Sequence, residues 1–450
     1  MTSGRPRAAV LTLGCRVNQY ESEAIETELV SLGFEIGAPD TVCDVYIINT
    51  CAVTGESERK SRQLIRRASS LNPAAFVLVT GCFSQIHAEE AAKIPGVDYV
   101  CGSRNKLSAA EMAVKLFREG GKGKPSCAVS SPDGAAMEVM NIPHAYRDRC
   151  FIKVEDGCDN ACTYCIIRKA RGSVVSRPPE EVLAEVKNIA ADGCREVILT
   201  GIEAASYGRD FVGERKGYSL AHLLAETAAV EGIERVRTGS LEPSVMTKDF
   251  CDTLAAAGRV MPSFHLSLQS GSDAVLAAMK RKYNRTQVLH NVAYMKSIMP
   301  GVTFTCDIIV GFPGETEEDF RLTMALAEEI GFLHMHIFPF SAREGTPAAE
   351  MKDQIPEATK RERARRLEAL GRSLSEKIYR AAIGSRRRVL FESRMGDSFF
   401  GHAEDMLEIY MKTEEDLGGR IFDVRLVSYD GGRMTAELIA EVPTDSERGA

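Results

Sequence analysis

The chain has 450 residues, of which 44% are hydrophobic and 26% are charged, so it can bury large cores and divide into two to four domains. Its formal net charge of −7 argues against a uniformly basic surface, and a nucleic-acid partner would have to be held by local patches. No apolar run approaches the roughly 20 residues of a membrane span. Residues 1–7 are polar and lack the apolar region of a signal peptide, so we expect a cytoplasmic protein.

The first hundred residues repeat one pattern. A short apolar, β-branched run ends in a cysteine and is followed by a helical stretch, which is typical of a parallel sheet. The carboxyl ends of parallel strands share one edge, where ligands bind, so these cysteines should converge unless they are strand-end thiols placed by chance. Cys101 follows a fourth run without a preceding Gly or Thr, and we expect it to be a packed thiol. The three runs are residues 8–13, 45–49 and 76–80, and their cysteines are Cys15, Cys51 and Cys82.

A second set of cysteines follows the apolar run at residues 151–154. Cys158, Cys162 and Cys165 have the spacing C-x3-C-x2-C, which can wrap three thiolates around one face of an iron–sulfur cube. Three ligands leave one iron open to a small molecule with an amine and a carboxylate. A structural zinc site is the alternative, but no partner C-x2-C or H-x3-H follows.

From residue 150 to about residue 340, strand-like and helical stretches alternate six times, which predicts an open, partial (β/α)8 barrel. Chemistry in such barrels takes place on the loops after the strands. Gly-rich turns there let a backbone approach a ligand, although each could also be a turn with a helix cap. The strand-like runs are residues 151–155, 196–200, 235–239, 264–269, 303–310 and 333–338, and the candidate ligand contacts on their loops are Glu203, Gln269, Ser270, Gly271 and Gly311.

The flanking segments differ in composition. Residues 120–146 are rich in Gly, Pro and Ser and read as a linker. Residues 356–388 carry eleven Lys or Arg against four Glu, which indicates either a phosphate track or a solvated connecting helix. Beyond residue 384 come five short strand-like runs, which predict a small β-barrel. That barrel has eight basic and twelve acidic residues, so its surface is not broadly basic.

Together these motifs resemble the radical-SAM (S-adenosylmethionine) methylthiotransferases. The resemblance implies an α/β protein with an N-terminal parallel-sheet α/β cluster domain (1–120), a linker (121–145), a partial (β/α)6 radical-SAM barrel (146–355), a basic helical connector (356–383) and a C-terminal all-β TRAM barrel (384–443). One departure is Arg168-Lys169, where the family usually has Pro-Tyr. The matching segments are residues 13–22, 49–54, 81–82, 158–165, 267–272 and 307–315.

Within the family, residues 17–21 most resemble the branch that acts on N6-threonylcarbamoyladenosine at position 37 of tRNA. The resemblance implies that Cys158, Cys162 and Cys165 hold a [4Fe-4S] cluster whose open iron chelates SAM. Reduction of SAM would then give a 5′-deoxyadenosyl radical. The same resemblance implies a second [4Fe-4S] cluster on Cys15, Cys51 and Cys82, which carries the sulfur that becomes the methylthio group at adenine C2. An external one-electron reductant and a sulfur donor are required.

Such chemistry needs no acid–base pair, which agrees with the lack of an obvious catalytic array. His265, His334 and His336 lie in strand-like runs and are expected to pack or to contact a ligand. Two other readings remain: a methylthiotransferase acting on a ribosomal protein, and an iron–sulfur RNA-binding or carrier protein without turnover. The candidate tRNA patches are residues 356–388, residues 280–282 and the basic cluster at residues 59–67.

Overall fold

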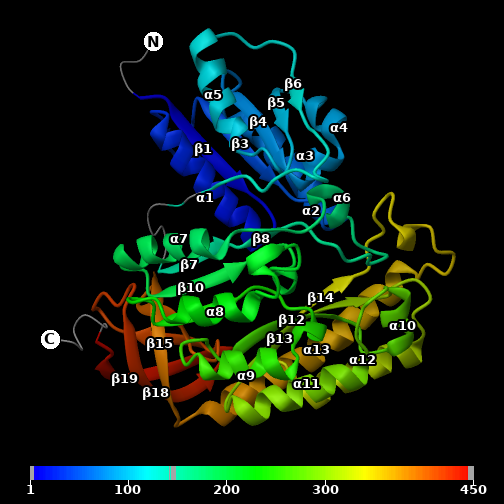
Figure 1. Cartoon of the computed structure of the whole chain (residues 1–450), viewed down its shortest axis with the longest axis vertical. Helices are drawn as coiled ribbons and strands as arrows, with labels where there is room; N and C mark the ends of the chain where they lie inside the picture. Colours follow the sequence, from blue (N-terminus) through cyan, green and yellow to red (C-terminus); the bar gives the residue numbers. More distant parts are fainter. Residues whose placement is uncertain (1–4, 141, 143–147, 444–450) are drawn as a thin grey trace.

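The computed structural model describes residues 5–140, 142 and 148–443, which form three stacked parts (Figure 1). An α/β domain made of the first 128 residues lies at one end. A half-barrel of strands and helices lies in the middle, and a closed β-barrel lies beside the half-barrel at the other end. The expected α/β class with a parallel sheet, a partial barrel and an all-β barrel is confirmed.

The N-terminal domain is a six-stranded sheet in the order β2-β1-β3-β4-β5-β6, and every pairing in it is parallel. Its strands are β1 (Arg7–Thr12), β2 (Glu35–Ile36), β3 (Val45–Thr50), β4 (Phe76–Gly81), β5 (Val97–Cys101) and β6 (Ser126–Ala128). Its helices are α1 (Arg16–Ser31), α2 (Gly55–Leu71), α3 (Cys82–Ile86), α4 (Ala88–Ala92) and α5 (Ser108–Glu119).

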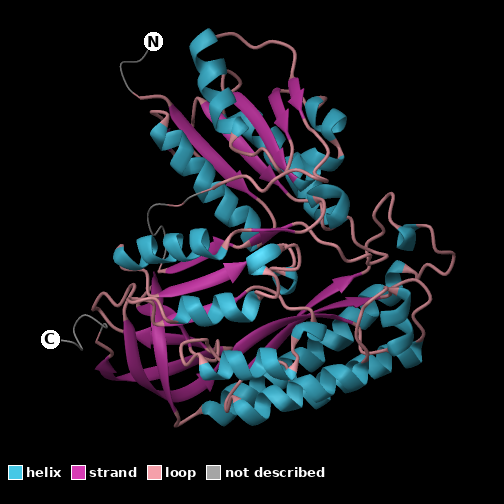
Figure 2. Cartoon of the chain, in the orientation of Figure 1, coloured by secondary structure: helices cyan, strands magenta, loops and turns pink. Residues whose placement is uncertain are grey.

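Alternation along the strands divides this core into two layers, as a strand period of two requires. Ala8, Ile47 and Leu78 pack with α1 and α5 on one face, whereas Ala9, Ile48 and Val79 pack with α2, α3 and α4 on the other (Figure 2). Strand β6 lies inside the segment expected to be a linker and extends the sheet to residue 128. Residues 141 and 143–147 of the expected linker and barrel start lie outside the described residues.

The middle part carries six parallel barrel strands in two sheets, ordered β11-β10-β7 and β12-β13-β14. Isolated bridges between Val236 and Val260 and between Leu241 and Leu266 connect the two sheets across the gap. The strands are β7 (Arg149–Lys153), β10 (Glu196–Thr200), β11 (Arg235–Thr238), β12 (Ser263–Gln269), β13 (Thr303–Val310) and β14 (His334–Pro339), with a small ribbon of β8 (Glu155–Asp156) and β9 (Val175–Ser176).

Helices cover the outer face of this half-barrel (Figure 2). Along β13, Phe304, Cys306 and Ile308 are fully or almost fully buried beneath them, while Thr305 and Asp307 point to the opposite, inner side, which we call the lumen. The helices are α7 (Pro179–Ala191), α8 (Leu220–Ala228), α9 (Lys248–Ala256), α10 (Asp273–Ala278), α11 (Arg285–Ile298) and α12 (Glu317–Ile330), whereas the short helix α6 (Ile167–Arg171) packs against α3 of the N-terminal domain.

Helix α13 (Glu357–Ala382) is the basic connector, and two of its basic side chains, Lys360 and Arg363, are buried inside the molecule. Arg363 is buried and pairs with Glu315 at 2.6 Å, and Lys360 donates to the Phe340 carbonyl at 3.0 Å. The closed barrel that follows has the order β15-β16-β17-β19-β18. Its strands are β15 (Arg386–Met395), β16 (Ser398–Ala403), β17 (Glu408–Lys412), β18 (Ile421–Asp430) and β19 (Arg433–Glu441).

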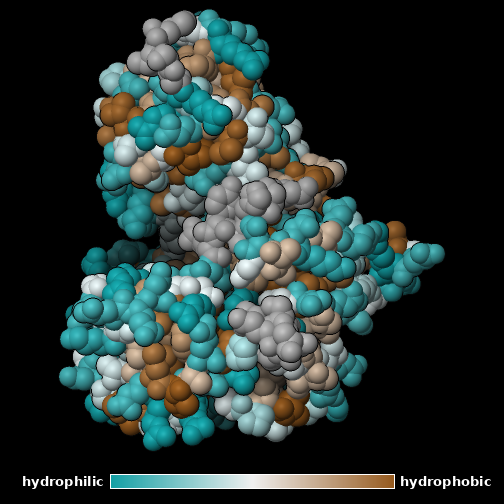
Figure 3. Space-filling view, turned by 90° about the vertical axis from the view of Figure 1, so that its left-hand side faces the viewer, coloured by the Kyte–Doolittle hydropathy of each residue, from teal (hydrophilic) through white to brown (hydrophobic). Residues whose placement is uncertain are grey.

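The outer surface is mostly hydrophilic in the view of Figure 3, with hydrophobic residues in small groups. In the part of the chain that the structure describes, we find no helix with both the length and the apolar character needed to cross a membrane.

Candidate active site

The three N-terminal cysteines follow β1, β3 and β4 at one edge of the sheet. Gly14 and Gly81, which precede Cys15 and Cys82, both have φ of +103°, a conformation that favours glycine. A side chain at Gly14 would lie 2.9 Å from Cys51 Sγ, so the strand-end loops come very close together. Burial, followed by the nearby Cys82, raises the pKa of the Cys51 thiol to about 11. The structure therefore brings the predicted first triad together.

Cys101 does not join this group. It is fully buried at the end of β5, in the core layer that faces α1 and α5, where it lies beside the hydroxyls of Thr80 and Ser108. Cys82 packs in the opposite layer.

The second triad lies on the loop between β8 and α6, and each of its sulfurs has a hydrogen-bond donor. The Asn160 and Ile167 backbone N–H groups donate to Cys158 Sγ and Cys165 Sγ, both at 3.4 Å. The Arg281 guanidinium donates to Cys162 Sγ at 3.1 Å. Such donors stabilise thiolates that bind metal. Burial raises the pKa of Cys158 to about 12 and that of Cys165 to about 11, so metal binding must displace their protons.

The spacing of the thiols bears on the zinc alternative. Four sulfurs around one zinc ion, each at about 2.3 Å, are about 3.8 Å apart. Among the described residues, the one group of three metal-ligating side chains with ligand atoms within 4.8 Å of one another is His265, Asp307 and His336. The thiols of neither cysteine triad form such a group among the described residues.

Buried carboxylates adjoin the second triad. Glu203 follows β10, and burial, followed by the nearby Glu242, raises its pKa to about 7. Glu155 accepts from the Glu203 backbone N–H at 2.5 Å, and burial raises its pKa well above the ordinary range. Glu155 Oε2, Glu203 Oε1 and Asn160 Oδ1 are buried without a hydrogen-bond partner among the described residues. Unpaired buried acceptors are costly, so these three oxygens are suited to a ligand with donors such as an ammonium group.

The other predicted ligand contacts differ in environment. Gln269 has φ of +65°, which is rare for a non-glycine residue and is found at functional sites. Ser270 and Gly271 instead face α12, where the Gly271 N–H donates to Thr323 Oγ1 at 3.0 Å. The Gly311 N–H donates to Glu315 at 2.7 Å, and a side chain at Gly311 would meet Lys360. Helix packing accounts for Ser270, Gly271 and Gly311, and their contact with SAM stays a prediction.

A cavity of about 180 Å³ lies between the N-terminal domain and the barrel. Val53 and Thr54 from the first triad's domain line it, together with Cys165 of the second triad, Gln269 and Asp307. The second predicted cluster site therefore borders the cavity through Cys165, and the first lies close to it through Val53, two residues after Cys51.

Buried charged side chains connect the N-terminal domain to the barrel. Arg171, on α6 directly after the second triad, is fully buried and donates from Nε to Cys82 Sγ of the first triad at 3.2 Å. Its guanidinium also pairs with Glu21 of α1 at 2.6 Å. Burial alone would raise the pKa of Glu21, but Arg171, Lys106 and Lys153 hold it well below the ordinary value.

The sequence did not single out Arg171 or Glu155 as site residues, and it placed Arg281 in a candidate tRNA patch at residues 280–282, whereas the structure directs Arg281 to Cys162. Glu155 comes just before the cysteine loop in the chain and Arg171 comes just after it. The sequence feature that could have identified them is a charged residue next to an apolar strand end. Arg168 and Lys169, the departure from the usual motif, lie on α6, where Lys169 donates to the Gly345 carbonyl at 2.6 Å.

This architecture is that of a radical SAM protein, and the model of the radical SAM superfamily matches residues 152–327. The model of uncharacterized protein family UPF0004 matches residues 7–102. Among solved structures, the radical SAM methyltransferase TsrM from Kitasatospora setae is similar, with a TM-score of 0.56, 15% identity and coverage of 77% of each chain. At that identity the likeness shows the fold alone.

Curated relatives are much more similar in sequence. The threonylcarbamoyladenosine tRNA methylthiotransferase MtaB of Bacillus subtilis is 38% identical over 96% of this chain and 97% of its own. The MtaB of Thermotoga maritima is 39% identical over 85% of each chain. A tRNA-2-methylthio-N(6)-dimethylallyladenosine synthase of Carboxydothermus hydrogenoformans is 33% identical over 93% of this chain and 96% of its own. The chain therefore belongs to the radical-SAM methylthiotransferase family.

Proposed function

We propose that this protein transfers a methylthio group to C2 of N6-threonylcarbamoyladenosine at position 37 of tRNA. The observation that carries the proposal is the pair of cysteine triads on different domains that adjoin one cavity. The substrate rests on relatives at 38% and 39% identity that are named for threonylcarbamoyladenosine. The relative named for dimethylallyladenosine is 33% identical. These relatives are named for tRNA substrates, which disfavours a ribosomal protein as the acceptor.

The residues of the two triads fit two [4Fe-4S] clusters. Cys158, Cys162 and Cys165 would hold the first, since each sulfur has a hydrogen-bond donor in place. Cys15, Cys51 and Cys82 would hold the second. When bound, the first cluster supplies the electron that cleaves SAM to a radical able to activate an unreactive C–H bond.

The protein's own residues would bind and orient the reactants. Glu203, with a buried oxygen that has no partner, would accept from the methionine ammonium of SAM, and Gln269 would contact SAM from the cavity wall. Arg281 and Arg171 place positive charge on Cys162 and Cys82, which would stabilise the thiolates that hold the clusters. The residues of both domains that line the cavity would hold the substrate base close to both triads.

The test is the nucleoside product. The chain would be reconstituted anaerobically with iron and sulfide and incubated with SAM, a reductant and tRNA that carries N6-threonylcarbamoyladenosine, and the tRNA would be digested for mass spectrometry. We expect the 2-methylthio derivative of that nucleoside and formation of 5′-deoxyadenosine. SAM cleavage with no tRNA product would overturn the substrate assignment, and absence of cleavage would favour a binding protein without turnover. We also propose that the protein is cytoplasmic, because its tRNA substrate, the reductant and the sulfur donor would all be found in the cytoplasm.

A further inference from the structure

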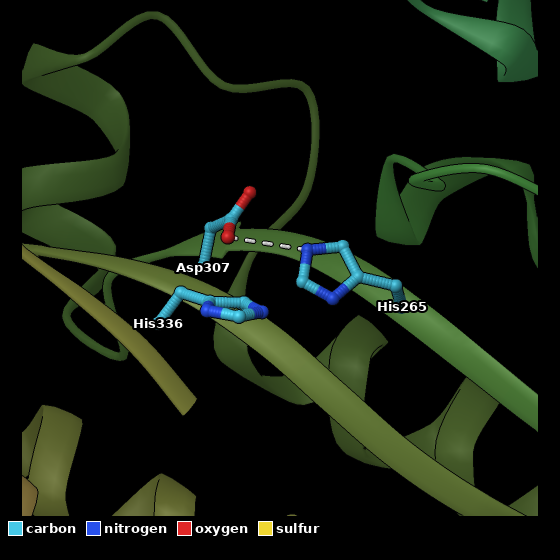
Figure 4. Close-up of side chains that lie close together, drawn as sticks. All are labelled: His265, Asp307 and His336. Carbon is cyan, nitrogen blue, oxygen red and sulfur yellow. Dashed lines mark ion pairs between the residues drawn. The ribbon is translucent and has the colours of Figure 1, made fainter. Parts of the chain in front are cut away.

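The lumen wall carries a polar group that neither triad uses. His265 on β12, Asp307 on β13 and His336 on β14 lie on adjacent strands, and their side chains gather at one point (Figure 4). His265 Nε2 is 3.2 Å from Asp307 Oδ1. His265 Nδ1 lies 2.8 Å from Thr305 Oγ1, which fixes the ring. The structure thus holds two imidazoles and a carboxylate, none of them fully buried, toward open space.

A cation from the other domain reaches the same lumen. Arg16 follows Cys15 at the start of α1, and its guanidinium lies 5.7 Å from the centre of the Phe151 ring on β7, the first barrel strand. Cys150 and Ile152 on either side of Phe151 pack in the core beneath the helices, so the Phe151 ring lies on the lumen side. Burial lowers the pKa of Arg16 most, followed by Arg149, while Glu196 and Asp307 raise it, and Arg16 is one of the groups that lower the pKa of His336. The ion pairs of the described residues include none with Arg16, which leaves its five N–H donors available.

This polar group lies close to both predicted cluster sites. Arg16 adjoins Cys15 of the first triad in the chain, and Asp307 lines the cavity that contains Cys165 of the second. Asp307 belongs both to the cavity and to the polar group, so a base in this cavity would lie next to that group.

We propose that Arg16, His265, Asp307 and His336 bind the threonylcarbamoyl substituent of the substrate base, an inference that rests on the proposed function. The substituent has a carboxylate, a hydroxyl and carbamoyl N–H groups. Arg16 binds the carboxylate, because guanidinium and carboxylate match in a bidentate pair. Asp307 accepts from an N–H or hydroxyl, and the two imidazoles complete the hydrogen bonds. A dimethylallyl substituent has no polar atoms and would offer no partner to Arg16, to His336 or to the remaining acceptor sites of Asp307.

Two imidazoles and a carboxylate are also a ligand set for a divalent metal ion. The positive Arg16 guanidinium in the same lumen disfavours a second cation there, because like charges repel strongly in a partly desolvated site. The polar substituent is the occupant that accounts for Arg16 as well as for the three ligating side chains.

The experiment measures binding of three anticodon stem-loops to the full chain with its clusters reconstituted. The first carries N6-threonylcarbamoyladenosine, the second carries the same group with its carboxylate converted to a methylamide, and the third carries adenosine. We expect the wild type to prefer the acid over the amide by about 10- to 100-fold. Arg16→Gln should remove most of that preference with little change for the amide, and Arg16→Lys should restore part of it. Asp307→Asn and His336→Asn should weaken both modified stem-loops.

Arg118→Gln, an exposed residue of α5 outside the candidate tRNA patches, is the matched control and should change none of the affinities. All variants are compared at equal iron content. Equal losses for acid and amide in Arg16→Gln, or equal wild-type affinity for all three stem-loops, would overturn the subsite. The subsite would also be overturned if the wild type bound one non-iron metal ion per chain and the His265→Asn variant lost that ion. If product still forms under those outcomes, the proposed function stands and only the subsite fails.

Discussion

Arg171 illustrates how a single residue can serve both cluster sites. It belongs to the radical-SAM loop by sequence, yet its guanidinium bonds the thiol of Cys82 in the other domain. Its charge is neutralised within the protein by Glu21 and Asp156. A buried arginine that lost these partners would be strongly destabilising, so the network fixes the relative position of the two domains.

At the residue scale, we predict that Cys101 binds no cluster. It lies in the core layer opposite Cys82, and a fourth thiolate would close the iron that the sulfur chemistry needs. Cys101→Ser should therefore retain full iron content and full methylthiolation, as measured by iron analysis and nucleoside mass spectrometry. Loss of about four iron atoms, one cube's worth, would show that Cys101 is a ligand.

At the element scale, Glu196 at the start of β10 joins the half-barrel to the closed barrel. It accepts from Arg149 and Arg237, both at 2.8 Å. Arg237 in turn donates to the Ala403 carbonyl at 2.9 Å, and Arg235 to the His402 carbonyl at 3.0 Å. One buried carboxylate therefore organises the arginines that hold the C-terminal barrel in place.

This network predicts a pH dependence of stability. Burial would raise the pKa of Glu196, but Arg237, Arg149 and Arg235 outweigh burial and hold the pKa well below its ordinary value. A depressed carboxyl pKa stabilises the fold above the unfolded value of about 4.3, and the contribution is lost as the pH falls below it. Glu196→Gln should lower the free energy of unfolding at pH 7 by about 3–5 kcal/mol and should flatten its decline below about pH 5.

Urea unfolding at pH 7, 5 and 3 measures both effects. Glu328→Gln on the exposed face of α12 is the control and should stay within about 0.5 kcal/mol of wild type. A Glu196→Gln variant with the same urea midpoint and the same pH dependence as wild type would contradict the role of this network.

At the scale of the whole molecule, the two triads lie on different domains, so their clusters should be separately removable. The reconstituted wild type should hold about eight iron atoms if both cubes form. The triple change of Cys158, Cys162 and Cys165 to Ala should leave one cluster and abolish SAM cleavage. The triple change of Cys15, Cys51 and Cys82 to Ala should leave SAM cleavage intact but stop methylthiolation. Product from the second variant would contradict the role of the N-terminal cluster.

The tRNA-binding surface is also a property of the whole molecule, and the structure divides one candidate patch. Arg281 turns inward to Cys162, while Lys280 and Lys282 on either side of it are exposed next to the cluster loop. Arg387 and Arg388 of β15, at the end of the basic patch at residues 356–388, pair instead with Asp405 and Asp423. Lys280 and Lys282, which are exposed beside the cluster loop, are therefore better placed than Arg387 and Arg388 to bind tRNA phosphates.

We predict that Lys280→Ala with Lys282→Ala weakens tRNA binding. Each phosphate contact that is lost should reduce the slope of log affinity against log salt by roughly one unit. SAM cleavage without tRNA should be unchanged, because neither lysine contacts the site. Filter binding at several salt concentrations measures the slope, and an unchanged slope would move the tRNA track to residues 59–67 or to α13.

The sequence by itself determined the local features. The spacing of Cys158, Cys162 and Cys165 places three thiols on one loop, the apolar runs that alternate with helical stretches predict the parallel sheet, and Gly14 and Gly81 mark the turns before two cysteines. The tertiary structure decided what lies opposite these elements: Arg171 against Cys82, α12 against Gly271, and Arg16 beside a lumen wall of another domain. A hydrophobic period states which face of an element is buried, whereas the identity of the residue across an interface depends on how complete domains pack.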